Sequence, residues 1–387
     1  MASKHEVMDF RNELEFLQKD NLYRTLITID ALGPTAKING KKVILLCSND
    51  YLGLSRNQRV IRSMIYAIKN GISQCSSRLV SGNSSTLEEL ESNLAKQKRR
   101  ESALVYPTGY MANLGVISNL ARKGDLIASD ELNHASIVDA CKLSGASVIV
   151  FKHNNVEDLQ STLSVGGYRH KLVVTEGVFS MDGDLADLKE IGKVSQENDA
   201  LLIVDDAHGD FVYGKHFRGT TEYLNAERYV DVIVSSMSKG LGSFGGYATG
   251  NSELMEYLIN KSRQFIYTSA LPTGFASASI VALKICMKGL QQRKLWNNVR
   301  KFREGLMNMG LNVGSSSHII PILIGDERRS LEFSKMLLKE GVFAQAIRYP
   351  TVPKGSARIR VSMTSLLDNY INDTLDAFCK VTRFISV

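Results

Sequence analysis

The sequence predicts an α/β protein with a mostly parallel sheet in a large domain, followed by a smaller C-terminal α+β domain. Short apolar runs rich in β-branched residues alternate with helix-like segments between about residues 100 and 240. Such runs are typical of strands that helices cover on both faces. A chain of 387 residues is also longer than one small core requires, so two lobes are expected.

Four segments precede this alternating region. "HEVMDFRNELEFLQKDNLYRTL" (5–26) predicts a helix and "KKVILLCS" (41–48) a short strand. Residues 57–71 place apolar side chains at helical spacing and end at Gly71, a residue suited to a helix C-cap. Residues 84–100 open with a capping-box pattern from Ser85 to Glu88, which predicts the next helix.

Six strand-like runs follow, each leading into a helix-like or loop segment. They are "ALVYP" (103–107), "DLIASDE" (125–131), "SVIVFKH" (147–153), "KLVVTEGVF" (171–179), "ALLIVDDAH" (200–208) and "VDVIVSSMS" (230–238). Ligands of parallel α/β sheets gather at the carboxyl ends of the strands. The polar residues that end these runs are therefore the candidates for a functional site.

A single long helix is predicted over 275–292, followed by a helix-strand-helix-strand tail that closes with a helix over 368–385. These segments divide the chain into an N-terminal helix and strand segment (1–50), a large domain (51–285) and a small domain (286–387).

Composition indicates a cytoplasmic protein of enzyme size. The chain is 44% hydrophobic and 22% charged, without the apolar run that a signal peptide or membrane helix needs. Five scattered cysteines argue against a disulfide framework or a zinc site. The net charge of +7 comes from lysines and arginines spread along the chain, which disfavours nucleic acid and suits an acidic or polyphosphate substrate.

The strongest chemical pattern joins "LLIVDDAHG" to "SSMSKGLGSFGG". Asp205 could be a helix cap or half of a structural ion pair, and Lys239 could be a surface charge at a turn. Together they suit pyridoxal phosphate (PLP), which needs a carboxylate to keep its ring nitrogen protonated and a lysine for a Schiff base. The glycines after Lys239 would let backbone and cofactor come close. The same run is not a dinucleotide-binding loop, because it lacks the G-x-G-x-x-G context.

Three further runs supply candidates for the same site. In "YPTGYMANLG", Gly109 and Tyr110 open a helix whose free N–H groups suit a phosphate. A simple strand-to-helix turn that binds no ligand would have the same sequence pattern. His134 stands at a strand-helix junction, where an imidazole could stack on a pyridine ring or be structural. Ser180 lies in a glycine-containing turn and could bond the ring oxygen.

The chain resembles the α-oxoamine synthase family in many motifs, which occur in the family's order between about residues 24 and 365. These are "SNDYLGLS", "SRLVSGN", "GYMANL", "LNHASIVDA", "TEGVFSMDGD", "VDDAHG" and "RYPTVPKGSARIRVSMT". The resemblance implies a PLP-dependent transferase of fold-type I, similar to aspartate aminotransferase. It also implies a homodimer with its active sites at the subunit interface, which condenses an amino acid with an acyl thioester and releases CO2.

The resemblance also implies roles for individual residues. Lys239 matches the Schiff-base lysine, Asp205 the partner of the ring nitrogen, His134 the stacking residue, and His208 and Ser180 the donors to the ring oxygen. The phosphate environment corresponds to Gly109, Tyr110, Ser236 and, from the other subunit, Thr268. Arg360 matches the residue that holds the substrate carboxylate, and the remaining substrate-contacting positions correspond to Arg24, Asn49 and Thr351.

Within the family, "AQAIRYPTVPKGSARIRVS" resembles the members of the biotin pathway, which join L-alanine to pimeloyl-CoA or a pimeloyl acyl carrier protein. Glycine with acetyl-CoA, or another acyl donor, is the alternative. Arg348 could pair with an acidic acyl tail. Two stretches depart from the family's pattern: "SQCSS" places Cys75 and Ser76 where glycines are usual, and "HGDF" is expected to place Asp210 and Phe211 beside the cofactor.

Overall fold

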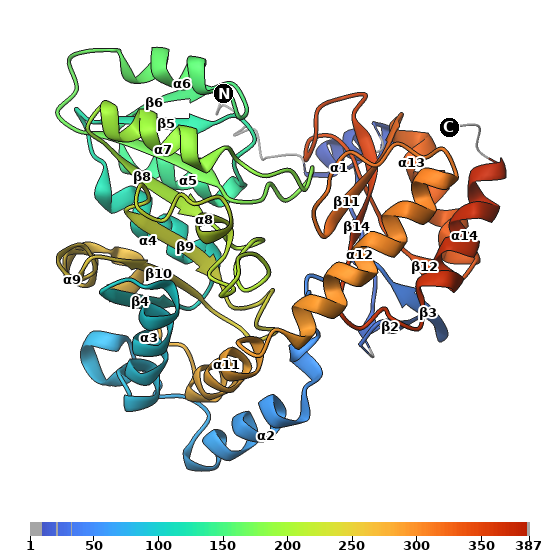
Figure 1. The fold of residues 1–387 in the computed structure, drawn as a ribbon, viewed down its shortest axis with the longest axis horizontal. Coiled ribbons are helices and arrows are strands. Elements are labelled where there is room, and N and C mark those ends of the chain that lie inside the picture. The colour runs from blue at the N-terminus through green and yellow to red at the C-terminus, as the bar shows by residue number, and fades with distance from the viewer. Residues whose placement is uncertain (1–9, 21, 32, 385–387) are drawn as a thin grey trace, which may run out of the picture.

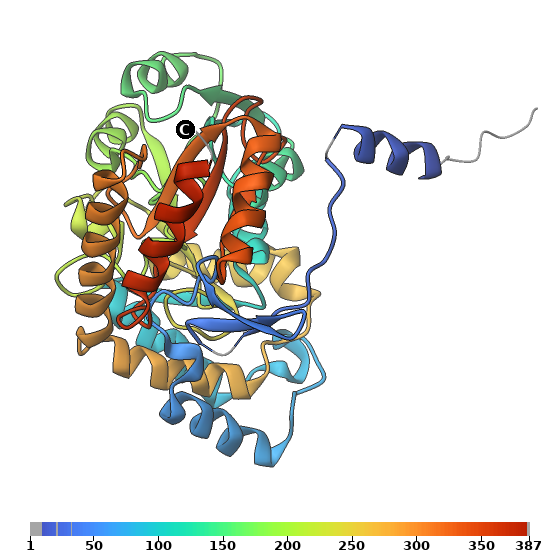
Figure 2. The same cartoon turned by 90° about the vertical axis from the view of Figure 1, so that its right-hand side faces the viewer.

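The computed structural model describes residues 10–20, 22–31 and 33–384, so the predicted helical positions 5–9, 21 and 385 lie outside the described residues. Two lobes lie side by side, with α12 (Leu290–Asn308) running from the large lobe into the small one (Figure 1). The first helix, α1 (Phe10–Lys19), stands away from both lobes (Figure 2).

The large lobe is built on a seven-stranded sheet in which β10 alone runs antiparallel to its neighbours. In spatial order the strands are β4 (Ser102–Tyr106), β10 (Gly246–Gly250), β9 (Val232–Ser236), β8 (Ala200–Asp205), β7 (Lys171–Glu176), β5 (Leu126–Asp130) and β6 (Ser147–Phe151). All six runs predicted as strands form strands of this sheet, and the predicted mostly parallel α/β architecture is confirmed.

Helices cover both faces of this sheet because successive strand residues point to opposite sides. In β7, Leu172 and Val174 pack into one apolar cluster with α4 and α5, whereas Val173 packs into another with α6 and α7. The helices of the large lobe are α2 (Gln58–Ala67), α3 (Ser85–Lys98), α4 (Gly109–Leu120), α5 (Ala135–Ser144), α6 (Val156–Leu163), α7 (Leu188–Glu197), α8 (Thr220–Tyr223), α9 (Ser252–Lys261), α10 (Arg263–Ile266) and α11 (Thr273–Cys286).

The small lobe contains two sheets and is built from segments near both the N-terminus and the C-terminus. One sheet has the order β11 (Ile319–Gly325), β14 (Ala357–Ser362) and β13 (Gln345–Ile347). The other has the order β1 (Asp30–Ala31), β2 (Thr35–Ile38), β3 (Lys41–Leu45) and β12 (Val342–Phe343). Because β3 pairs in parallel with β12, the N-terminal strands complete the small lobe. The helices α13 (Glu327–Lys339) and α14 (Ile371–Phe384) also belong to this lobe.

Several predicted helix boundaries are wrong. The helix predicted over 5–26 ends at Lys19, and the one predicted over 368–385 begins at Ile371. The cap of α3 is Ser84 rather than Ser85, since the Ser84 hydroxyl accepts a hydrogen bond from the Leu87 N–H at 3.3 Å. The long helix predicted over 275–292 is two helices, α11 and α12, at 71° to each other. Gly289 lies at the break with a φ of 69°, a left-handed conformation that glycine adopts without strain.

Over residues 10–20, 22–31 and 33–384, no single helix is long and apolar enough to cross a membrane. Only the α11–α12 pair reaches the required length and composition jointly, and the bend of 71° divides it.

Candidate active site

Seven of the predicted residues converge on a cavity of about 250 Å³ at the carboxyl ends of β7, β8 and β9, namely Gly109, Tyr110, His134, Asp205, His208, Ser236 and Lys239. Parallel strands bring their carboxyl ends to one edge of the sheet, which explains why residues distant in sequence meet there. The cavity is lined by Thr108, Gly109, Tyr110, Asn113, His134, Ser136, Glu176, Asp205, Ala207, His208, Ser236, Ser238, Lys239, Phe244 and Gly245.

A hydrogen-bonded chain runs from Lys239 into the core. Lys239 Nζ lies 2.9 Å from His208 Nε2, and His208 Nδ1 lies 2.6 Å from the Tyr51 hydroxyl. Burial lowers the pKa of Lys239, and burial together with the charge of Lys239 lowers the pKa of His208 well below its usual range. The imidazole is therefore neutral at neutral pH, and one of its nitrogens can accept a proton.

Asp205, the last residue of β8, is held by donors on both carboxylate oxygens. Oδ2 accepts a hydrogen bond of 2.6 Å from Asn113 Nδ2, and Oδ1 accepts one of 2.9 Å from the Ala207 N–H. The same Asn113 amide donates to the Ser136 hydroxyl at 2.9 Å. These bonds fix a buried carboxylate at the floor of the cavity, where it can meet a cationic nitrogen of a ligand.

His134 and Tyr110 form one wall of the cavity. His134 is the N-cap of α5, and its Nδ1 accepts a hydrogen bond from the Ser136 N–H at 3.2 Å. That bond sets the orientation of the ring, and burial lowers the pKa of the imidazole. The Tyr110 ring lies edge-on to His134 with centroids 6.3 Å apart, and its hydroxyl donates to Asp139.

The opening of α4 and the end of β9 form an anion-binding corner. Thr108 caps α4, so the N–H groups of Gly109 and Tyr110 lie in the first turn, where helical hydrogen bonds have not yet begun. A Cβ on Gly109 would come within 3.1 Å of Ser236 Cβ, so glycine keeps this corner open. Ser236 Oγ lies 2.7 Å from Ser238 Oγ, which places two hydroxyls at the same point.

Glu176 also faces the cavity, although it was not among the predicted site residues. It is the last residue of β7, is 2% exposed, and its Oε1 has no hydrogen-bond partner among the described residues. Burial, followed by the charge of Asp205, raises the pKa of its carboxyl well above its usual range. Its signal in the sequence was its position: a carboxylate ending a buried strand, like Asp205.

Arg360, Asn49 and Ser180 form a second cluster at the junction with the small lobe. Arg360 on β14 donates to the Ser180 carbonyl at 2.6 Å through Nε and to Asn49 Oδ1 at 3.3 Å through Nη1. The Tyr51 hydroxyl donates to the same Asn49 oxygen at 3.2 Å, which connects this cluster to His208. Ser180 is buried, and only its backbone carbonyl contacts Arg360.

The other predicted contact residues lie outside the 250 Å³ cavity. Arg24 Nη2 donates to Thr351 Oγ1 at 3.4 Å, and both residues line a separate cavity of about 660 Å³ together with Arg348. Thr268 follows α10 on the surface, next to the bridge between Ser77 and Ser269.

The expectation that Asp210 and Phe211 lie beside the cofactor is wrong. Asp210 is 1% exposed and forms an ion pair with the equally buried Lys98, whose Nζ also donates to the Arg218 carbonyl at 2.8 Å. Phe211 is wholly buried in the apolar core. Neither residue lines the cavity. Asp210 instead binds Lys98, Ser235 and Tyr247 in the core.

Comparison with known proteins gives a family and a set of relatives. Residues 41–378 match the family model of aminotransferase class I and II. The chain is 42% identical, over the full length of both proteins, to 8-amino-7-oxononanoate synthase of Thermoanaerobacter pseudethanolicus. It is 43% identical to the Geotalea daltonii enzyme of that name, over 92% of each chain.

Solved structures give the same fold. Serine palmitoyltransferase of Sphingomonas wittichii superposes with a TM-score of 0.93 at 33% identity, covering 99% of both chains. The crystal structure of 8-amino-7-oxononanoate synthase from Francisella tularensis gives a TM-score of 0.78 at 27% identity, covering 89% of this chain and 98% of that one.

The chain belongs to the aminotransferase class I and II family, whose fold-type I architecture it shares. Within that family it is a PLP-dependent acyltransferase of the α-oxoamine synthase group. The cavity fits this cofactor chemically. It offers an amine at Lys239, a fixed carboxylate at Asp205, and free N–H groups and hydroxyls in the corner of Gly109 and Ser236.

Proposed function

We propose that the protein is an 8-amino-7-oxononanoate synthase, which condenses L-alanine with a pimeloyl thioester and releases CO2 and the thiol carrier. The observation that carries this proposal is the 42% identity to the Thermoanaerobacter enzyme from end to end, in a chain that keeps Lys239, Asp205 and both histidines in one cavity. The carrier is CoA or an acyl carrier protein.

PLP, when bound, supplies an electron sink that stabilises a carbanion at the α-carbon of the amino acid. Lys239 would hold the cofactor through its amine, and Asp205 would keep the ring nitrogen cationic. His134 would stack on the ring, and His208 and Ser180 would bond its oxygen. Gly109, Tyr110, Ser236 and the partner-subunit copy of Thr268 would hold the phosphate.

Lys239 is also the base that suits the first proton transfer. Because burial lowers the pKa of its amine, a larger share of Lys239 is neutral at neutral pH than of an exposed lysine. The neutral Nζ can accept the α-proton of the amino acid, and the resulting ammonium can donate a hydrogen bond to His208 Nε2 at 2.9 Å. Tyr51 holds the imidazole in place through Nδ1, so the proton path has a fixed geometry.

Arg360 is the proposed anchor for the carboxylate of the amino acid. Its Nε donates to the Ser180 carbonyl and its Nη1 to Asn49 Oδ1, and these two bonds orient the guanidinium. A planar guanidinium matches two carboxylate oxygens, so Arg360 would hold the amino acid by its carboxylate and fix its orientation in the site. Arg24 and Thr351, in the neighbouring 660 Å³ cavity, are proposed contacts for the acyl donor. Arg348, whose Nη2 donates to the Tyr23 carbonyl at 3.3 Å, lines the same cavity and is the proposed partner of an acidic acyl tail.

We also propose a homodimer whose interface completes each site. Exposed apolar side chains support it, namely Tyr66, Ile72, Leu79 and Val80 on one segment and Tyr267 on another. The bridge between Ser77 and Ser269 joins the two segments. Thr268 lies between Tyr267 and this bridge, where we expect a residue that contributes to the partner's phosphate site. The projecting α1, which buries none of its own residues, adds a second surface for a partner.

Release of free thiol tests the substrate pair. PLP-loaded protein is given pimeloyl-CoA with L-alanine, acetyl-CoA with glycine, or palmitoyl-CoA with L-serine, and the thiol is measured against time. The third arm is included because serine palmitoyltransferases share the fold at a TM-score of 0.93. Fastest release in the first arm supports the proposal. Fastest release in either other arm would reassign the substrate within the same reaction class.

The cytoplasm is the proposed compartment. All five cysteines are free thiols, and Cys141 and Cys286 are buried without a partner sulfur, as expected in a reducing environment.

A further inference from the structure

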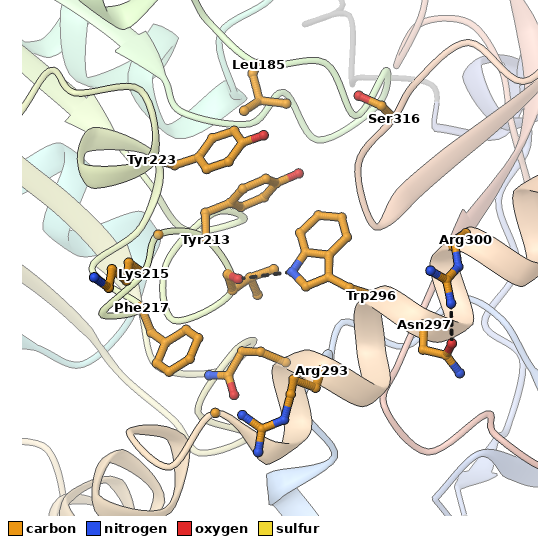
Figure 3. A pocket seen from close by; sticks show the side chains of 14 residues that line it. Leu185, Tyr213, Lys215, Phe217, Tyr223, Arg293, Trp296, Asn297, Arg300 and Ser316 are labelled. Atoms are coloured by element: carbon orange, nitrogen blue, oxygen red, sulfur yellow. Dashed lines mark hydrogen bonds between the residues drawn. The ribbon is translucent and has the colours of Figure 1, made fainter.

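A cavity of about 840 Å³ lies in the seam between the two lobes and shares no lining residue with the Lys239 cavity (Figure 3). The large lobe contributes the segment after β8, and the small lobe contributes α12 and the loop before β11. The lining residues are Leu185, Val212, Tyr213, Gly214, Lys215, Phe217, Tyr223, Gly289, Gln292, Arg293, Trp296, Asn297, Arg300 and Ser316.

Aromatic rings from both lobes form one side of this inter-lobe cavity. The Tyr213 ring lies 5.0 Å from Trp296 and 5.1 Å from Tyr223, measured between centroids. Figure 3 shows the two tyrosines one above the other, with the indole facing them. The indole N–H donates to the Val212 carbonyl at 3.4 Å, which fixes the face that the ring presents. Such walls suit a flat aromatic ring.

The charged residues of the cavity are all cations. Lys215, Arg293 and Arg300 line it, and no aspartate or glutamate stands among the lining residues. Among the residues that the structure describes, neither Lys215 nor Arg293 forms an ion pair, while Arg300 donates to Asn297 at 3.0 Å. Three cations without a lining carboxylate favour a phosphate, with its charge near −2, over a single carboxylate.

Space at the base of the cavity depends on Gly289. A Cβ at this position would lie 2.7 Å from the Phe217 ring and 3.3 Å from Arg293 Nη1. Gly289, at the break between α11 and α12, is therefore close to both Phe217 and Arg293. The side-chain amide of Gln292 is already engaged, because its Nε2 donates to the Phe211 carbonyl at 2.8 Å and to the Cys286 carbonyl at 3.3 Å.

We propose that the inter-lobe cavity binds a nucleotide, with the base against Tyr213, Tyr223 and Trp296 and the phosphate between Lys215 and Arg293. Its volume falls within the range of about 300–1,000 Å³ that holds small ligands. An aliphatic chain would leave the cations without a partner, and inorganic phosphate would leave the aromatic wall exposed. A nucleotide satisfies both parts of the cavity.

A contact path connects this cavity to the active site. Tyr213 and Trp296 both lie against His318, whose ring is 4.2 Å from Tyr51 between centroids. Tyr51 in turn bonds His208 beside Lys239. Burial lowers the pKa of His318 to about 3, so this buried ring is neutral. Binding that shifts Tyr213 would act on the residue that positions His208.

The chain contains a single tryptophan, so fluorescence excited at the indole reports on Trp296 alone. The test titrates adenosine 5′-monophosphate into the PLP-loaded enzyme and follows Trp296 emission, with calorimetry as a second readout. Adenosine and ribose 5-phosphate serve as probes for the base and the phosphate separately. We expect saturable quenching by the nucleotide, and at least about tenfold weaker binding of either fragment, since each loses one set of contacts.

Arg293→Gln and Lys215→Gln should each weaken nucleotide binding about tenfold, the loss of one charge-assisted contact, with unchanged thermal stability. Lys301→Gln is the matched control, because Lys301 is an exposed cation of α12 outside the cavity. No saturable binding, or equal binding by Arg293→Gln and the control, would overturn the proposal. So would a KM for pimeloyl-CoA that rises in step with the nucleotide Kd, because the site would then hold the nucleotide end of the substrate.

Discussion

The buried ion pair between Lys98 and Asp210 is predicted to contribute strongly to the stability of the fold, and this contribution can be measured directly. Both side chains are almost fully buried, at 0% and 1% exposure. Asp210 Oδ2 also accepts from Ser235 Oγ at 2.7 Å and from the Tyr247 hydroxyl, and Lys98 donates to the Arg218 carbonyl. Asp210→Asn keeps the shape and the two hydroxyl donors but leaves the Lys98 ammonium without its anion.

Removing one partner of a buried ion pair costs about 3–5 kcal/mol, because the other charge stays buried and uncompensated. For 387 residues unfolding together, an entropy of about 2.1 cal/mol/K per residue gives about 0.8 kcal/mol/K. Asp210→Asn should therefore lower the melting temperature by about 4–6 °C. Lys98→Met should cost less, since Ser235 and Tyr247 still donate to the carboxylate.

The double variant Lys98→Met with Asp210→Asn completes the cycle. It buries no charge, so it should be more stable than Asp210→Asn alone. Thermal unfolding followed by circular dichroism, at one protein concentration for all four proteins, measures the coupling. A shift below about 1 °C for Asp210→Asn, or additive effects in the double variant, would refute the reasoning.

Three further predictions concern the active site and its support. Tyr51→Phe removes the hydroxyl 2.6 Å from His208 Nδ1 and should lower kcat about five- to tenfold with little change in KM, measured by thiol release; an unchanged kcat would contradict it. Burial alone would lower the pKa of His153, but its two carboxylate partners, Asp130 and Asp184, raise it to about 10. His153→Gln should therefore destabilise the protein most below about pH 6.5. In urea titrations, the difference in unfolding free energy between this variant and wild type should shrink toward pH 10. A difference that stays constant from pH 6 to 10 would argue against the ion pairs. Since burial keeps Glu176 protonated, Glu176→Gln should keep the melting temperature within about 2 °C and retain the visible absorbance of bound PLP, whereas a larger loss would mean that the carboxyl is ionised.

The sequence predicts those site residues whose positions are set by the ends of strands. Asp205 and Lys239 each follow a buried apolar run, and the ends of neighbouring parallel strands meet at one edge. A reader of the sequence can therefore bring these residues together without knowing the angle of any helix. The roles assigned to them by resemblance remain predictions that the proposed assays test.

The rest depends on contacts across long stretches of chain. Tyr51 meets His208 from 157 residues away, and Asn113 meets Asp205 from 92 residues away. Nothing in the local pattern around either residue indicates these bonds, because both lie in segments that also fit ordinary core packing. Asp210 shows that closeness in sequence does not place a residue in the site either. It is two residues from His208, but its side chain is buried in the core and forms an ion pair with Lys98.

The parallel pairing of β3 with β12 has a consequence for biosynthesis. The seven strands of the large sheet are complete once the ribosome has passed Gly250, whereas β3 has no neighbour on its far side until Val342 and Phe343 emerge. Long-range pairing of this kind closes late, because the intervening chain must first be ordered. The first strands to be synthesised are thus among the last to be covered. A nascent chain that ends between Gly250 and Val342 therefore carries all seven strands of the large sheet but leaves one edge of β3 unpaired.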